Sequence, residues 1–103
     1  MRYVLVLQWP AETLAEFDEL VAIEETLTRC LGEHSTVDGH DFGSGEMNVF
    51  VLTDQPSDAF AEAEIALRGN ERWSAVRAAY RGAEGDTYTI VWPPGASSPF
   101  SVR

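Results

Sequence analysis

A short polar stretch, residues 38–48, holds the densest group of side chains that could do chemistry. Its polar members are three acids, a histidine, a serine and an asparagine: Asp38, His40, Asp41, Ser44, Glu46 and Asn48. Histidine titrates near neutral pH, and an adjacent carboxylate can orient its ring for acid–base work. Asp38 and His40 share a face of an extended strand and could coordinate one metal ion, with Glu46 or His34 as a third ligand. We treat the six residues as a candidate ligand or partner site.

The same stretch also has a purely structural interpretation. Aspartate and glycine form tight turns, and His40 can hydrogen-bond an aspartate or the backbone of an edge strand. No zinc, EF-hand or hydrolase spacing is matched, and Gly43-Ser44-Gly45 lacks both the spacing and the strand–turn–helix context of a nucleophile elbow. The sequence therefore assigns no catalytic residue, no metal ligand and no cofactor.

Residues 35–42 and 46–53 flank this turn and predict a β-hairpin. If Ser44-Gly45 is the turn, Asp41 lies opposite Asn48, and the carboxylate can accept a hydrogen bond from the amide. If Gly43-Ser44 is the turn, Asp41 lies opposite Glu46, which is unfavourable without a cation between them. The first register is preferred. Glycine and aspartate are poor strand formers, so the first arm is expected to be a short or bulged edge strand.

The elements that position the hairpin can be read from the periodicity of apolar residues. Residues 2–9 predict a strand that is apolar on both faces, as in the centre of a sheet. Residues 14–31 predict a helix that begins at a capping box formed by Thr13 and Glu16. A second helix is predicted to start at 54–57 and to stop at Gly69-Asn70. Residues 73–81 fit a helix or a strand, and the strand at 87–92 favours a second hairpin.

This order of elements predicts an α+β fold, a ferredoxin-like βαββα(ββ) sandwich with two helices on one face of an antiparallel sheet. We expect residues 1–93 to form one domain and residues 94–103 a flexible tail with Phe100 as its only anchor. The two-sided apolar strand at 2–9 also requires a cover for the face without helices. A second subunit or a ligand would be the simplest cover.

Charge and cysteine content exclude several classes of function. The 103 residues carry 17 acids and 7 basic residues, a net charge of −10, of which −8 falls in residues 1–52. Nucleic acids and anionic membranes need a cationic surface, so neither is an expected partner. The single cysteine excludes an internal disulfide and a cysteine-rich metal site. The apolar run at the start is only about seven residues long, and no small-residue cleavage site precedes Glu12, so a strand is favoured over a signal peptide. No segment approaches the length of a membrane span, and we expect a cytoplasmic location.

Two motifs carry a resemblance to a protein group. Residues 38–48 have the pattern D-G-H-D-x-G-S-G-E-x-N before an apolar strand, and residues 88–93 have the pattern Y-T-x-x-W-P. In both, the chain resembles a group of small bacterial proteins of uncharacterised activity. The resemblance implies a ferredoxin-like fold and a cytoplasmic protein, and it carries over no catalytic residue.

Two classes of function follow from these observations. The first is a non-enzymatic interaction protein, either a homodimer or a module whose acidic helix face binds a basic partner, as immunity-type and antitoxin-type proteins do. The second is a small-molecule binder or cofactor-free enzyme of the dimeric α+β barrel type, with its site on the open sheet face near His40 and Asp41. The absence of a strong catalytic pattern favours the first.

Overall fold

The computed structural model describes residues 2–13, 15–95 and 100–102, and these form an α+β fold, as predicted. Met1, Leu14 at the predicted start of the first helix, and residues 96–99 and 103 of the predicted tail lie outside the described residues. The elements in chain order are β1 (Tyr3–Pro10), α1 (Ala15–Cys30), β2 (Ser35–Gly43), β3 (Glu46–Thr53), α2 (Pro56–Leu67), the short 3₁₀ helix η1 (Glu71–Ala75), β4 (Arg77–Gly82) and β5 (Thr89–Trp92). None of the helices described is long and apolar enough to cross a membrane.

The five strands form one sheet in the order β2-β3-β1-β4-β5, and every neighbouring pair is antiparallel. β1 therefore lies at the centre, as its two apolar faces predicted. Its side chains alternate between two separate clusters of buried residues. Leu5, Leu7 and Trp9 belong to one cluster, whereas Val4 and Val6 belong to the other.

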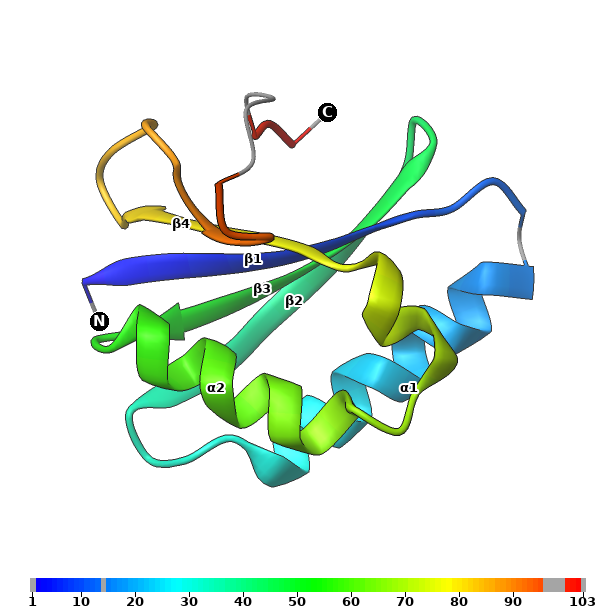
Figure 1. Ribbon diagram of the computed structural model, residues 1–103, viewed down its shortest axis with the longest axis horizontal. Helices are drawn as coiled ribbons and strands as arrows, with labels where there is room; N and C mark the ends of the chain where they lie inside the picture. Colours follow the sequence, from blue (N-terminus) through cyan, green and yellow to red (C-terminus); the bar gives the residue numbers. More distant parts are fainter. Residues whose placement is uncertain (1, 14, 96–99, 103) are drawn as a thin grey trace.

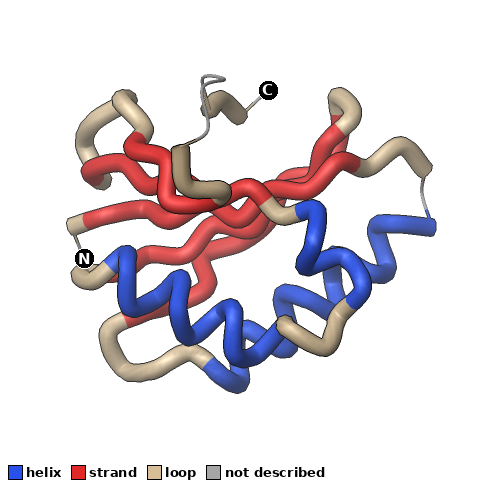
Figure 2. Tube along the Cα trace, in the orientation of Figure 1, coloured by secondary structure: helices blue, strands red, loops and turns tan. Residues whose placement is uncertain are grey.

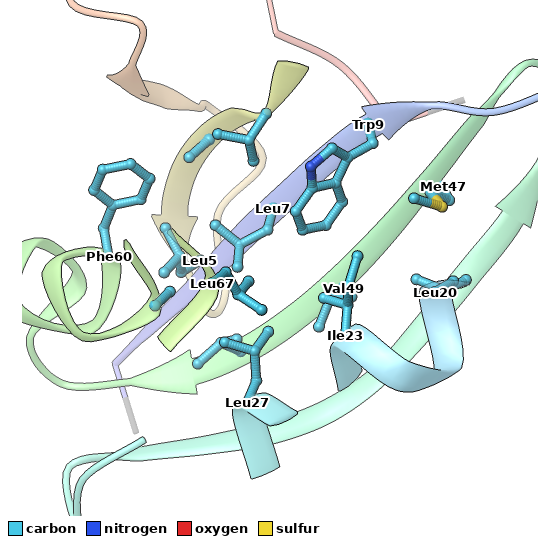
Figure 3. Packing of buried hydrophobic residues seen from close by; sticks show 14 of the residues in the cluster. Leu5, Leu7, Trp9, Leu20, Ile23, Leu27, Met47, Val49, Phe60 and Leu67 are labelled. Atoms are coloured by element: carbon cyan, nitrogen blue, oxygen red, sulfur yellow. The ribbon is translucent and has the colours of Figure 1, made fainter. Parts of the chain in front are cut away.

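Both α-helices cover the same face of the sheet, and residues 100–102, here called the C-terminal segment, lie on the opposite side (Figure 1). The two layers are clear when the chain is coloured by secondary structure (Figure 2). The main core lies between these layers, where Leu20, Ile23 and Leu27 of α1 face the apolar side chains of β1 and β3 (Figure 3). Burial of this stripe is the main reason why α1 is stable as a helix, since propensity alone is weak in water.

The ambiguous segment at 73–81 divides into two elements. Trp73 lies in η1, and the strand begins only at Arg77. β4 pairs with β5, so the predicted second hairpin is confirmed. The ring of Trp73 packs at 5.5 Å from that of Phe60 in α2, which explains its helical spacing in the sequence.

The sheet face without helices is covered in part by the end of the same chain. Phe100 is buried there against Val4, Val6 and Ala79. The side-chain amide of Gln8 also donates a hydrogen bond to the main-chain carbonyl of Ser101, at 2.9 Å. Residues far apart in sequence thus contribute to the cover that the sequence assigned to a second subunit or a ligand.

Candidate functional site

The hairpin of β2 and β3 has the register that was preferred from the sequence. Ser44 and Gly45 form the two-residue turn, and Asp41 lies opposite Asn48. Both turn residues have positive φ, 55° for Ser44 and 82° for Gly45, as the right-handed twist of a tight hairpin requires. β2 is an edge strand, as predicted, and of the two expected forms, short or bulged, it has the bulged one, over nine residues.

A bulge in β2 changes which residues share a face. The register shifts between Val37, which lies opposite Val51, and Gly39, which lies opposite Phe50. Asp38 is the extra residue, and Gly39 has φ 151°, a value that other residues rarely adopt. The expectation that Asp38 and His40 share a face assumed strict alternation, and the bulge interrupts that alternation between them.

His40 lies on the helix side of the sheet. Its Nδ1 atom is 2.9 Å from Oε2 of Glu24 in α1, and its ring meets the edge of Phe17 at 5.6 Å. Phe17 makes a similar edge contact with Phe42, so the three rings fill the space between α1 and the edge strand. The carboxylate beside the histidine is therefore Glu24, from a different element, and not a neighbouring aspartate.

The contact between Glu24 and His40 involves one nitrogen of the histidine ring and leaves the other free of this carboxylate. An ionised carboxylate only accepts hydrogen bonds, so Nδ1 of His40 carries the proton of this bond and Nε2 is left as the second functional atom. Such a pair can orient a base, but catalysis also needs a substrate position beside it. The hollow between α1 and η1 is lined by Glu19, Asn70 and Arg72 and not by His40, so it does not provide a substrate position beside this pair.

Asp41 and Asn48 lie on the other face, but the expected hydrogen bond from the Asn48 amide to the Asp41 carboxylate is not formed. Asn48 is fully buried, and its Oδ1 accepts a hydrogen bond from Nε2 of Gln8 at 3.0 Å. Gln8 is the neighbour of Asn48 in β1, on the side away from Asp41. Asp41 is exposed on the edge strand, where water can solvate its carboxylate.

The hydrogen bonds of Gln8 define the orientation of both amides. The carbonyl of Ser101 can only accept, so the group of Gln8 that faces it must be the NH₂. The same NH₂ donates to Asn48, and this leaves the Nδ2 atom of Asn48 as a buried donor without a partner among the residues described. A buried N–H without an acceptor is unusual and costs free energy.

The six candidate residues therefore do not converge on one point. His40 lies beside α1, Asp41 and Asn48 lie on the opposite face, and Ser44 lies at the turn. Glu46 starts β3 opposite Pro10 of β1. Within the described ranges, no three His, Cys, Asp or Glu side chains lie close enough together to hold a metal ion.

Sequence reasoning missed one residue of the open face, Gln8, which is buried and is the single polar residue on its face of an otherwise apolar strand. Phe100 is buried, as expected of an anchor, but nothing local in the sequence indicates that it packs against Val4 and Val6. Phe100 is also not the only anchor, because the carbonyl of Ser101 accepts a hydrogen bond from Gln8 and Val102 packs against the same cluster.

The charge of the molecule is concentrated in its helical layer. Residues 11–34 and 54–75, which contain the helices and their connections, carry twelve acids and three arginines, a net −9 of the total −10. The strands, their hairpin turns and the chain ends account for the remaining −1. The strands, their turns and the chain ends therefore carry almost no net charge, whereas the helical layer is strongly acidic.

Arg72 forms ion pairs with two carboxylates of α1. Its guanidinium contacts Oε2 of Glu16 at 3.0 Å and also binds Glu19, across the start of α1. These two carboxylates raise the pKa of Arg72. The backbone N–H of Glu12, assisted by that of Thr13 and by Arg72, lowers the pKa of Glu16. Of the predicted capping box, the hydrogen bond from the backbone N–H of Thr13 to the carboxylate of Glu16 is thus present.

We expect Glu16→Gln to destabilise the protein at pH 7 and to lose this effect in acid. The folded state lowers the pKa of Glu16, so its contribution is present above the ordinary carboxylate pKa and disappears as the pH falls through the lower, folded value. Urea unfolding at pH 7 and near pH 3 checks this. Glu25→Gln, the same change at an exposed position of α1, is the control. A Glu16→Gln deficit as large in acid as at pH 7 would contradict the prediction.

Comparison with known proteins adds no relative. No family model matches the chain, and neither the curated proteins nor the solved structures contain a significant match.

Proposed function

We propose that the protein is a non-enzymatic interaction module whose acidic helical layer binds a basic surface of a protein partner. The observation that carries this proposal is the location of the charge, with −9 of −10 in the helices and their connections. A one-sided distribution of charge steers a partner to one face and raises the rate of association. The sheet side, with almost no net charge, would take little part in this recognition.

The exposed acids of this layer are spread over both α-helices and η1. Asp18 and Glu25 lie on α1, Asp58 lies in the first turn of α2, and Glu71 begins η1. All four are exposed, so their carboxylates are available to a partner. Glu16 and Glu19 are already engaged by Arg72 and would contribute less.

We further propose that the topology is ferredoxin-like with one added strand. The chain contains two strand–helix–strand units, β1-α1-β2 and β3-α2-β4. In the sheet, β3 lies between β1 and β2, and β1 lies between β3 and β4, so the two units interleave as they do in a ferredoxin-like sheet. The helices of both units lie on the same side (Figure 1). β5 extends the sheet beyond β4. Many unrelated functions use such a fold, so the proposed function rests on the charged surface and not on the fold.

The alternative, a small-molecule or cofactor-free catalytic site near His40 and Asp41, receives less support. The two side chains lie on opposite faces of the sheet, since the partners of His40 are Glu24 and Phe17 of α1. A homodimer through the open face would have to displace or share Phe100, which is buried there. We therefore favour the helical layer as the functional surface.

Two variants that lose the same number of negative charges at different surfaces test the proposal. One variant neutralises the helical layer with Asp18→Asn, Glu25→Gln, Asp58→Asn and Glu71→Gln. The matched control neutralises the hairpins with Asp38→Asn, Asp41→Asn, Glu84→Gln and Asp86→Asn. Both variants change the net charge from −10 to −6, and all eight positions are exposed. The control also removes two acids of the candidate site in β2.

Binding of a fluorescent octa-arginine peptide, measured by anisotropy at low and moderate salt, is the readout. Exposed ion pairs contribute about 0.2–1 kcal/mol each, so the helical variant should bind roughly tenfold more weakly, and the control within about twofold of the wild type. Affinity should fall as salt rises. Equal losses in both variants, or binding that salt does not change, would contradict the proposal.

A further inference from the structure

The open sheet face carries a second, smaller apolar cluster. Val4 and Val6 of β1 and Ala79 of β4 form its floor, and Phe100 is buried on top of them. Further apolar side chains at its margin are half-buried: Phe50, Leu52, Tyr88, Ile90 and Val102. Without residues 100–102, this floor would be an apolar surface open to water.

The C-terminal segment is held by three kinds of contact. The ring of Phe100 lies 5.0 Å from that of Tyr88, and the guanidinium carbon of Arg77 lies 5.4 Å from the Phe100 centroid. The main-chain carbonyl of Ser101 accepts the hydrogen bond of Gln8. An aromatic anchor in a pocket, together with a bound main-chain carbonyl, is how a groove recognises an extended peptide.

The present occupant leaves one polar group of the face unused. Nδ2 of Asn48 is buried beside Gln8 and has no acceptor among the residues described. Its position on the open face follows from the alternation of β3, because Met47 and Val49 on either side belong to the main core. An occupant with an acceptor at this point would satisfy a donor that the chain's own segment does not.

We propose that the open sheet face is a peptide-binding groove and that residues 100–102 occupy it as an intramolecular competitor. The external ligand is an extended peptide of another protein, with an aromatic side chain in the place of Phe100 and a following main-chain carbonyl that accepts from Gln8. This surface lies opposite the acidic helical layer, so the inference goes beyond the proposed function and does not depend on it.

The competition has a quantitative consequence. A segment tethered to its own groove acts at an effective concentration that reaches the order of mM for a short linker. An external peptide with the same contacts therefore binds the intact protein weakly, because it must displace that segment. Weakening the tethered segment should raise the affinity for the external peptide without changing the groove.

The experiment uses the full chain with Phe100→Ala and a fluorescent peptide with the sequence of residues 97–103, Ser-Ser-Pro-Phe-Ser-Val-Arg. The matched peptide has alanine in place of phenylalanine. We expect the variant to bind the phenylalanine peptide at least about tenfold more tightly than the wild type does, and the alanine peptide to bind neither protein. Equal binding of both peptides, or no saturable binding to a folded variant, would overturn the proposal.

Two further substitutions separate loss of the groove from loss of the fold. Phe100→Leu keeps an apolar cover but loses the ring contacts with Tyr88 and Arg77, so it should show an intermediate affinity even if Phe100→Ala unfolds. Adding Tyr88→Ala to either Phe100 variant should weaken peptide binding severalfold, because Tyr88 is part of the groove. Unchanged affinity on removal of Tyr88 would overturn the assignment of the groove.

Light scattering during size-exclusion chromatography tests whether the segment instead binds a second copy. We expect the wild type to be monomeric across the concentrations used for the titration. A wild-type dimer that Phe100→Ala converts to a monomer would overturn the proposal, because the segment would then dock between copies.

Discussion

Trp9→Ala lowers the free energy of unfolding by about 3–5 kcal/mol, the largest effect that we expect from a single core truncation. Trp9 is almost fully buried at the end of β1 and points into the layer between sheet and helices (Figure 3). Its Nε1 also donates a hydrogen bond to the carbonyl of Arg72, at 3.0 Å. Truncation therefore opens a cavity and removes the bond that ties η1 to the central strand.

Urea unfolding followed by circular dichroism measures this loss. A domain of this size has a total stability of about 5–15 kcal/mol, so Trp9→Ala should be near the limit of folding. Trp9→Phe keeps most of the apolar volume and should lose clearly less, whereas Ile65→Ala, at a position 63% exposed, should stay within about 0.5 kcal/mol of the wild type. A loss below about 1 kcal/mol for Trp9→Ala would show that the site repacks.

Asn48→Asp lowers the free energy of unfolding by about 3 kcal/mol at pH 7, although the two side chains have the same shape. The change places a carboxylate at a fully buried position, where Gln8 is the one described hydrogen-bond donor to the side chain. Burial disfavours the ionised form and raises the pKa of the new carboxyl. The folded state then binds a proton more tightly than the unfolded state does.

The sign of the pH dependence follows from this difference. As the pH falls from 7 towards 4, the buried carboxyl takes up its proton and the variant regains stability relative to the wild type. Unfolding curves at several pH values for both proteins give this difference directly. Asp41→Asn, opposite Asn48 but exposed, is the control and should change stability by less than about 0.5 kcal/mol. A pH-independent deficit for Asn48→Asp would mean that water reaches the carboxylate.

The elements of this fold that could be predicted from sequence are those that local rules specify. The alternation of β1 predicted a central strand, and the unfavourable pairing of Asp41 with Glu46 in the alternative register predicted the register of the first hairpin. In both cases residues close together in the sequence carry the information, because period-2 burial and the pairing across a short hairpin involve only a few nearby positions. The α+β class followed from the order of the elements.

The candidate site was less predictable because its contacts join distant parts of the chain. His40 meets Glu24 across sixteen positions, and Gln8 meets Asn48 across forty. The bulge at Asp38 interrupts the alternation between Asp38 and His40, and sequence patterns indicated a bulge without locating it. Counted from the turn, His40 lies opposite Val49 of the main core, but no local pattern shows that Glu24 of α1 lies beside that position.

The sequence by itself determined the number of acids, the class of fold and the polar hairpin between two strands. Only the tertiary structure decided where the charge lies and what covers the open face. The net charge is a sum along the chain, but the electric field that a partner meets depends on where the charges lie. Both helices pack on one side of the sheet, and this places −9 of the net charge of −10 in one layer. Phe100 buries itself against β1 because apolar area is gained wherever the chain can reach it, which no local pattern specifies.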